Sequence, residues 1–244
     1  MKFVLACALL CGITRAQVAV PFKGCKSGGQ TGPVEASKGK SISKVVSQQV
    51  ANQLAIYNFE GGAVGVLAPR GWYRFGTYGS AGTALFVSPE PINAANLFST
   101  GRGGFTGPVI EVSENFGETS GRFEVADIIA RVFPAWKSFV TKVMNEGDPI
   151  PSSFAFGPYP GDTMTYKGKT VAEYTTRTGT DGLGTQWKVK KDSSPIEGVA
   201  ILIGQIPDAL LLSVRLPPDL KGLASTIIRQ VERDAARIPN NQPD

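Results

Sequence analysis

Four glutamates are the side chains of this sequence whose types and spacing come closest to a catalytic arrangement. Glu111, Glu114, Glu118 and Glu124 surround the predicted start of a long helix. Paired carboxylates held about 5–9 Å apart in a cleft perform acid–base or glycosidic chemistry, and clustered carboxylates bind Ca²⁺. The alternative is ordinary charge at a strand edge and at a helix N-terminus, where the helix dipole favours acids. We adopt this second interpretation and predict no metal site and no cofactor.

Other catalytic systems find little support. The sequence contains no histidine, which excludes Ser-His-Asp and Cys-His nucleophile systems and every His-ligated metal site. Ser37-x-x-Lys40 and Ser41-x-x-Lys44 match the S-x-x-K pattern of penicillin-binding enzymes, but the companion S-D-N and K-T-G motifs are absent. The glycine-rich stretch 76–82 is neither G-x-G-x-x-G nor a Walker motif. We therefore expect a protein that is not an enzyme.

Aromatic and cationic residues near the glycine-rich loops are the candidates for binding. Tyr73, Arg74 and Tyr78 flank the stretch 76–82, and Arg102 lies in Gly101-Arg102-Gly103-Gly104. Arginine and tyrosine offer large contact areas and several hydrogen-bond donors, and they are enriched among interface hot spots. These four residues are predicted to contact a protein, a peptide or a glycan of the cell envelope.

The first sixteen residues have the order of a secretory signal. Lys2 supplies a positive charge, an apolar run follows from Phe3 to Leu10, and Thr14-Arg15-Ala16 ends the segment with small residues at the positions that a signal peptidase reads. A short membrane anchor is the alternative, although a span needs about 20 apolar residues. We predict cleavage after Ala16 and a periplasmic or secreted protein.

The cysteine count, the net charge and the hydropathy limit the covalent links, ligands and membrane spans expected of the mature chain. Removal of residues 1–16 leaves Cys25 as the one cysteine, either protected, joined to another molecule, or lipidated, although Lys23 disfavours lipidation. The net charge of +5 falls to +3 without Lys2 and Arg15, and no basic block is present. Nucleic-acid binding needs clustered basic residues, so it is not expected. No second long apolar segment follows, and none is predicted to span a membrane in the mature chain.

The first half of the chain is predicted to contain an arm, a helix and strands. Residues 17–40 are rich in Gly, Ser, Lys and Pro and are expected to form an extended arm. Ser41 or Ser43 would cap a helix that carries Val46, Val50, Leu54 and Tyr57. Residues 93–107 show no pattern and are expected to be a loop. The expected strands are 63–67, 72–77, 84–88 and 108–116.

The second half is predicted to contain a long helix, hairpins and a final helix. Apolar residues recur at helical spacing from Val125 to Val143, which predicts a helix over 120–147, either kinked at Pro134 or divided into two there. Trp136 is expected in its buried stripe, so that Trp136→Ala would cost about 3–5 kcal/mol. A final helix carries Leu220–Ala235. The expected strands are 163–166, 170–176, 185–191, 199–203 and 210–216.

Short turns between these strands predict an antiparallel sheet with helices on its faces, which is an α+β fold. Neither half has enough strands to cover its helices alone. Residues 41–239 are therefore expected to form a single domain, and residues 240–244 a frayed tail.

The stretch Val66-Leu67-Ala68-Pro69-Arg70-Gly71-Trp72, the strand Lys169–Thr176 and the helix Leu220–Ala235 together resemble the Mog1/PsbP-like α/β/α sandwich. That resemblance implies accessory, non-catalytic roles. Phe22-Lys23-Gly24-Cys25, Gly29–Pro33 and Gly71–Gly76 are also similar to uncharacterised secreted bacterial proteins. This second resemblance implies a cysteine in some relatives where this chain has Arg74, and hence no such disulfide here.

The combined expectation is an extracytoplasmic, non-catalytic binding or accessory protein whose ligand the sequence does not identify. The alternative is a cell-envelope hydrolase that uses paired carboxylates. A cleft containing two of the four glutamates would favour the enzyme, and an apolar or aromatic patch without close carboxylates would favour the binding protein.

Overall fold

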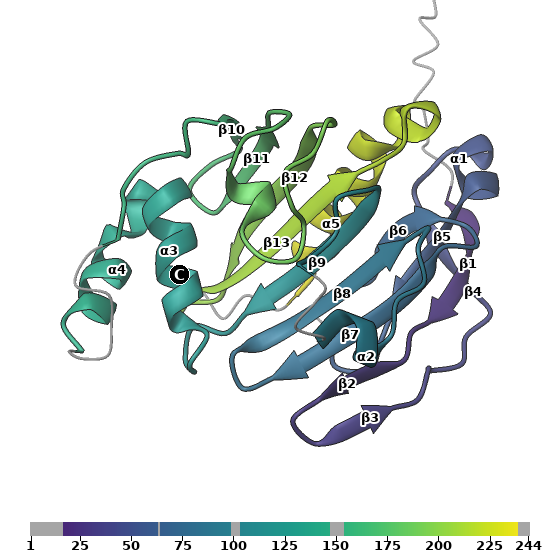
Figure 1. Ribbon diagram of the computed structural model, residues 1–244, viewed down its shortest axis with the longest axis horizontal. Coiled ribbons are helices and arrows are strands. Elements are labelled where there is room, and N and C mark those ends of the chain that lie inside the picture. The colour runs from purple at the N-terminus through teal and green to yellow at the C-terminus, as the bar shows by residue number, and fades with distance from the viewer. Residues whose placement is uncertain (1–16, 63, 99–102, 147–153, 239–244) are drawn as a thin grey trace, which may run out of the picture.

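Strands make up most of the regular secondary structure, and they form two mixed sheets. The computed structural model describes residues 17–62, 64–98, 103–146 and 154–238. The larger sheet has nine strands in the order β10-β11-β12-β13-β9-β8-β7-β2-β3 (Figure 1). In that order the strands span Asp162–Tyr166, Val171–Thr176, Ile196–Ile203, Asp208–Arg215, Val109–Asn115, Gly82–Ser88, Tyr73–Gly79, Ser27–Gly29 and Gly32–Val34.

The smaller sheet has four strands in the order β4-β1-β5-β6, which span Ser41–Lys44, Val18–Gly24, Leu54–Asn58 and Val66–Pro69. Two parallel pairs, β1 with β5 and β2 with β7, make both sheets mixed. The other pairs are antiparallel. The antiparallel arrangement predicted for the second half of the chain is therefore confirmed.

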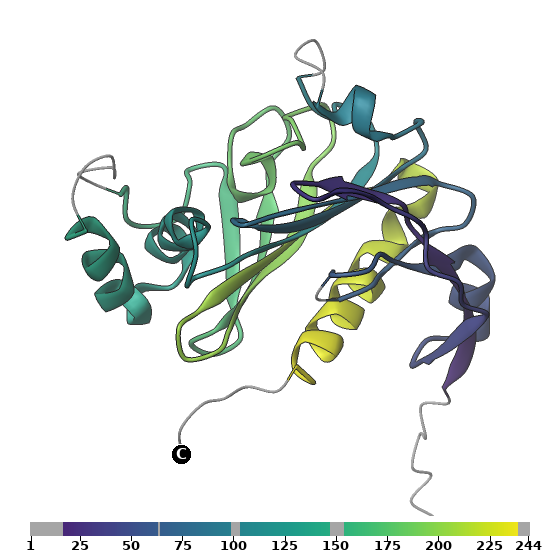
Figure 2. The same cartoon turned by 90° about the horizontal axis from the view of Figure 1, so that it is seen from below.

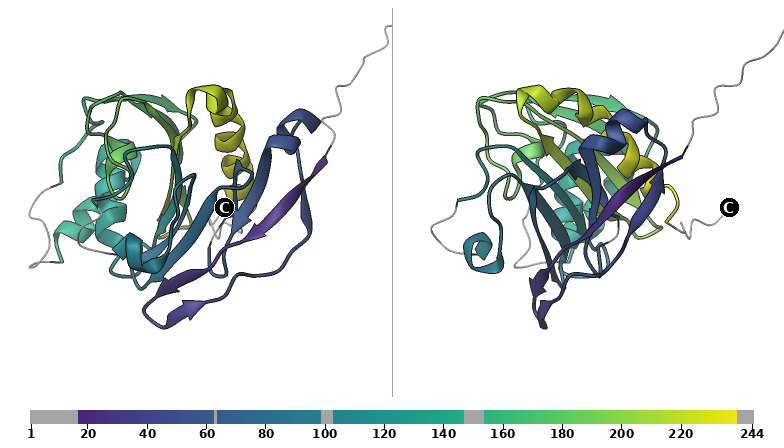
Figure 3. Two further views of the ribbon diagram at one scale, coloured as in Figure 1. Left: turned by 45° about the vertical axis from the view of Figure 1, so that its right-hand side comes forward. Right: turned by 90° about the vertical axis from the view of Figure 1, so that its right-hand side faces the viewer.

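Helices lie on both faces of the nine-stranded sheet. Helix α3 (Arg122–Val132) and helix α4 (Lys137–Met144) lie on one side, and helix α5 (Ala224–Ala235) lies on the other, between the two sheets (Figure 2). The left-hand view of Figure 3 also shows α5 between the large sheet and the small one. Strands β12 and β13 are thus covered on both faces, as their continuous apolar sequences predict.

The region around Pro134 forms two helices, the second of the two arrangements expected there. Helix α3 ends at Val132, a short 3₁₀ turn covers Pro134–Trp136, and α4 begins at Lys137. Val125, Ile129 and Val140 are fully buried in the stripe. Trp136 is only partly buried, because it lies in the turn, where its indole N–H donates to the Lys169 carbonyl. The expectation of a core position for Trp136 is therefore wrong.

The helix expected to carry Val46, Val50, Leu54 and Tyr57 is much shorter than predicted. Helix α1 covers only Gln48–Gln53, and its cap is Ser47, whose side chain accepts from the Val50 N–H. Ser41 and Ser43 lie in β4 instead. The residues that follow, from Leu54 onward, are buried on both faces of β5 between β1 and β6. Burial on both sides favours a strand there over the helical spacing seen in the sequence.

Three irregular regions also differ from expectation. The predicted arm 17–40 is extended, but its strands β1 and β2 pair within the two sheets. The expected loop 93–107 contains helix α2 (Ala94–Phe98), which Asn93 and Asn96 cap reciprocally. The strand expected over 185–191 is absent, and only Val189 bridges to Phe105 in that range. A 3₁₀ turn spans Leu183–Thr185 instead.

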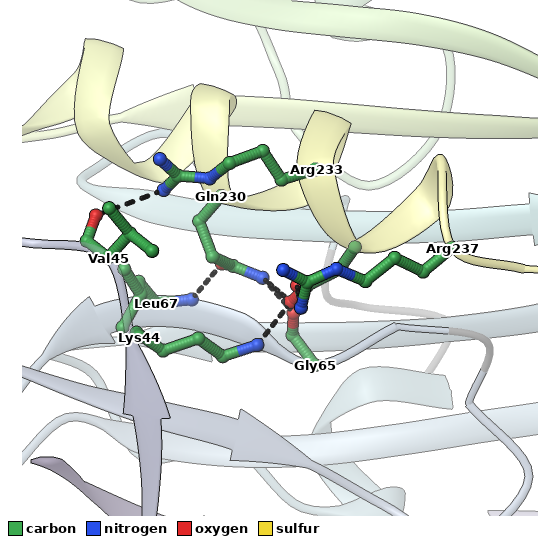
Figure 4. Close-up of polar contacts among 8 residues, drawn as sticks. Lys44, Val45, Gly65, Leu67, Gln230, Arg233 and Arg237 are labelled. Carbon is green, nitrogen blue, oxygen red and sulfur yellow. Dashed lines mark hydrogen bonds and ion pairs between the residues drawn. The ribbon is translucent and has the colours of Figure 1, made fainter. Parts of the chain in front are cut away.

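A buried polar cluster joins α5 to the smaller sheet (Figure 4). The side-chain amide of Gln230 accepts from the Leu67 N–H at 2.7 Å and donates to the Gly65 carbonyl at 2.7 Å. Lys44 of β4 pairs with Asp234 of α5, and Gln230 also donates to Asp234. Lys44, which is the lysine of the S-x-x-K match at Ser41, is therefore engaged with Asp234 of α5.

Candidate functional site: a cavity beneath helix α3

A cavity of about 820 Å³ lies between the nine-stranded sheet and α3. Its floor is formed by β7, β8, β9 and β13, and one wall by the first turns of α3. Aromatic side chains from α2, α3 and two irregular segments complete the lining, namely Phe98, Phe123, Phe154, Tyr159 and Trp187. The cavity is thus concave and mostly apolar, as small-molecule sites are.

Glu111 is the most unusual residue of this floor. It lies in the middle of β9, opposite Phe86 of β8 and Ser213 of β13. The strand places Glu111, Ser113 and Asn115 on the cavity face, as the alternation in the sequence predicts. Glu111 is only 5 % exposed, and its Oε2 atom has no hydrogen-bond partner among the described residues. A buried carboxylate oxygen of this kind is costly unless something donates to it.

Burial raises the pKa of the Glu111 carboxyl to about 7. The backbone N–H groups of Val189 and Lys188, and the ammonium groups of Lys190 and Lys188, offset part of that increase. The hydroxyl of the neighbouring Ser213 does not help, because it is hydrogen-bonded to the Tyr174 hydroxyl at 2.7 Å. Glu111 therefore changes its charge near neutral pH.

Asp127 is a second polar group, on the α3 wall of the cavity, and its carboxylate already accepts a hydrogen bond. Gln186 donates through Nε2 to Asp127 Oδ2 at 2.7 Å and contacts the Tyr159 hydroxyl at 3.0 Å. Arg131 stacks over the Tyr159 ring, 4.0 Å from its centroid. Burial raises the pKa of Asp127, and Arg131, Gln186 and Tyr159 offset part of that effect. Asp127 thus holds the Gln186 side chain in place at this wall of the cavity.

Buried Arg215 holds the segment that carries Gln186 and Trp187. It donates to the carbonyls of Gly107 at 2.8 Å, Phe105 at 2.7 Å and Lys190 at 2.5 Å. Phe105 and the segment also exchange backbone hydrogen bonds. Trp187 contacts the Phe86 ring at a centroid distance of 5.5 Å and stays 44 % exposed. The cavity wall is therefore fixed by a buried guanidinium group.

The four glutamates predicted as possible catalysts separate in the structure. Glu111 and Glu124 both line the cavity, with Glu124 exposed on the first turn of α3. Glu114 points to the opposite face of the sheet, where burial and the nearby Asp208 raise its pKa to about 7. Glu118 is exposed in the loop that precedes α3.

The residues predicted to bind a partner do not share one site. Tyr78 lines the cavity, while its hydroxyl contacts Thr31 and the Gly32 carbonyl. Tyr73 is 50 % exposed at the start of β7. Arg74 points inward, donates to the Gly24 carbonyl at 3.1 Å and lies beside Cys25. Arg102 is outside the described residues. A recognition surface built on these four residues stays a prediction.

Cys25 is a protected side chain. It is 1 % exposed, and its thiol donates to the Lys23 carbonyl. Burial raises the pKa of the thiol to about 12, although the charge of Arg74 opposes this. Of the three states considered from the sequence, the structure shows the buried free thiol.

The described residues include neither a metal-binding cluster of side chains nor a helix that could span a membrane. No three His, Cys, Asp or Glu side chains among them gather in a way that would hold a metal ion. None of the described helices has the length and apolar character needed to cross a membrane.

Comparison of the chain with family models, with curated proteins and with solved structures gives no match. The resemblance to the Mog1/PsbP-like sandwich therefore has no support from a solved structure. The geometry of the cavity is the remaining basis for a function.

Several residues of the cavity were not singled out from the sequence. Asp127 lies between the buried Ala126 and Ile128 of α3, and as a charged residue it does not belong to the apolar stripe from which that helix is predicted. Gln186 and Trp187 lie in a segment that has no regular structure, so no periodicity marks them. Arg215, which holds the wall of the cavity without lining it, ends a mostly apolar strand. A charged residue at the end of such a strand is the one feature of the sequence that could have indicated a buried polar contact there.

Proposed function

We propose that this protein is an extracytoplasmic, non-catalytic binding protein whose cavity holds a small organic molecule. The observation that carries the proposal is the unpartnered Oε2 atom of Glu111 on the floor of an 820 Å³ cavity. Ligand sites commonly have volumes of about 300–1,000 Å³, with few polar groups among apolar walls. An unsatisfied buried acceptor costs about 1–3 kcal/mol, and a donor on a ligand would remove that cost.

One feature of the sequence and one of the fold support the rest of this proposal. The leader-like order of residues 1–16 supports export to the periplasm or beyond. Helices on both faces of a largely antiparallel sheet are compatible with a Mog1/PsbP-like sandwich, which serves accessory roles. Because a fold alone does not determine function, the cavity has to be tested directly.

A neutral fluorescent probe tests whether the cavity binds ligands. The dansyl sulfonamide of 5-aminopentanol has an aromatic body and no charge at pH 8, and its emission increases in apolar surroundings. We expect saturable binding to the native protein. Ser113→Phe, which fills the floor beside Glu111, should abolish that binding. Ser138→Phe, on the exposed face of α4, is the matched control and should bind as the native protein does.

Thermal unfolding of each variant shows that the fold is retained. A folded Ser113→Phe variant that binds the probe as tightly as the native protein would contradict the proposal, and so would a native protein that binds neither this probe nor the two charged probes described below.

One observation favours a second function, that of a hydrolase. Glu111 and Glu124 line the same cavity, and a pKa of about 7 suits Glu111 to act as a general acid. Against this, the nearby Asp127 carboxylate is already bonded to Gln186. Turnover of nitrophenyl glycosides or esters that is lost in Glu111→Gln and kept in Glu114→Gln would establish the enzyme.

A further inference from the structure

We propose that the ligand of this cavity is an organic ammonium ion with an apolar body, whose positive head pairs with Glu111. This inference rests on the binding function proposed above and specifies the chemical class of its ligand. It follows from the charge of the lining, the position of the nearby lysines and the aromatic walls.

The charge of the lining favours a cation. Among the described residues that line the cavity, three are acidic, Glu111, Glu124 and Asp127, and none is Lys or Arg. The charged side chains that line the cavity would therefore repel an anionic ligand, although Arg122 and Arg131 stack over the lining rings of Phe123 and Tyr159. A cation would be attracted more strongly than in water, because the buried floor has a low dielectric constant.

The lysines nearest to Glu111 do not neutralise it. The ammonium group of Lys188 donates to the Leu97 carbonyl at 3.2 Å, and that of Lys190 donates to the Trp187 carbonyl at 2.7 Å. The two ammonium groups act on Glu111 through their charge, and the backbone N–H groups of Val189 and Lys188 also face its carboxyl, but the Oε2 atom has no hydrogen-bond partner among the described residues. A ligand can therefore supply the hydrogen-bond donor that the Oε2 atom of Glu111 lacks.

The carboxylate on the wall is not an equivalent partner. Asp127 already receives a hydrogen bond from Gln186 and feels the charge of Arg131. Asp127 therefore adds negative potential, and Glu111 is the group that binds the head.

The aromatic walls suit the same ligand. Phe123 and Phe154 pack partly against the core, and Trp187 and Phe98 keep exposed rings at the cavity. Aromatic faces attract cations within about 6 Å and also cover apolar groups. An ammonium ion on an apolar body would use both properties.

Three dansyl probes that differ only in their heads test the ligand class at pH 8. Dansylcadaverine ends in an ammonium group, the aminopentanol derivative in a hydroxyl, and the 6-aminohexanoate derivative in a carboxylate. We expect the native protein to bind the ammonium probe about tenfold or more tightly than the alcohol, as a charged hydrogen bond in a buried site implies. The carboxylate probe should bind most weakly.

Two variants of β9 provide the matched comparison. Glu111→Gln keeps the shape of the side chain and removes its charge, so the preference for the ammonium head should fall to about twofold or less. Glu114→Gln removes a carboxyl of similarly raised pKa on the opposite face of the same sheet, and it should keep the full preference.

The outcomes separate this inference from the proposed function. Equal affinity for the ammonium and alcohol probes in the native protein would overturn the ligand class and leave a binding cavity. Tighter binding of the carboxylate probe would also overturn it, as would a preference that survives in Glu111→Gln. Failure of all three probes to bind would contradict the proposed function as well.

Discussion

Ionisation of the buried Glu111 carboxyl lowers the free energy of unfolding, so the stability of the protein depends on pH. Its pKa of about 7 lies above the ordinary value of 4.5, so the folded state holds this proton more tightly than the unfolded chain does. Stability from this group is complete below about pH 4.5 and is lost as the pH rises to about 7. One pKa unit corresponds to about 1.4 kcal/mol, which makes the loss on the order of 3 kcal/mol.

Glu111→Gln removes this ionisation. We expect the variant and the native protein to have similar free energies of unfolding at pH 4, and the variant to be more stable by about 3 kcal/mol at pH 8. Urea unfolding at a series of pH values measures the difference. The exposed Glu118→Gln is the control and should show no such trend. If the difference in free energy of unfolding between Glu111→Gln and the native protein does not depend on pH, the pKa of the Glu111 carboxyl is not raised.

The second residue-scale prediction concerns Cys25. Because the thiol is buried and its pKa is raised to about 12, it is protonated and inaccessible in the folded protein. We expect no labelling by a thiol-reactive dye at pH 8 within minutes, and one label per mature chain in 6 M guanidinium chloride. Rapid labelling of the native protein would place Cys25 at the surface.

At the scale of elements, the break at Pro134 decides which side chains of this region carry stability. Ile129 of α3 is fully buried, whereas Trp136 lies in the turn between the helices and is only partly buried. We expect Ile129→Ala to lower the free energy of unfolding by about 2–5 kcal/mol and Trp136→Ala to lower it by less. Denaturant unfolding of both variants measures this, and a larger effect at Trp136 would contradict the assignment.

The elements that could be predicted from the sequence are those whose apolar residues recur at a single spacing, either helical or strand-like. The stripe of α3, the hairpins β10–β13 and helix α5 are of this kind. Strand β5 escaped prediction because its residues are spaced as in a helix, and only pairing with β1 and β6 makes them a strand. The cavity escaped prediction for a related reason. Its lining comes from segments far apart in the chain, and neither Gln186 nor Trp187 lies in a regular element.

At the scale of the whole molecule, the predicted export signal can be tested on the protein recovered from outside the cytoplasm. Residues 1–16 lie outside the described part of the structure, and β1 begins at Val18. We expect cleavage after Ala16, which makes Gln17 the first residue and allows it to cyclise. Mass spectrometry of the exported protein checks this. An intact Met1 or a chain that starts at a lipidated Cys25 would contradict it.

The contact of Gln230 with the smaller sheet affects how copies of this protein meet one another. Strand β6 is an edge strand of that sheet, and the Gln230 amide binds the N–H of Leu67 in β6 and the carbonyl of Gly65, which directly precedes β6 (Figure 4). Unpaired strand edges recruit strands of other molecules and promote aggregation. Gln230→Ala should therefore increase light scattering on mild heating, whereas the exposed Arg229→Ala should not. This protection depends on a side chain of α5, so any event that detaches the C-terminal helix also frees a sheet edge for self-association.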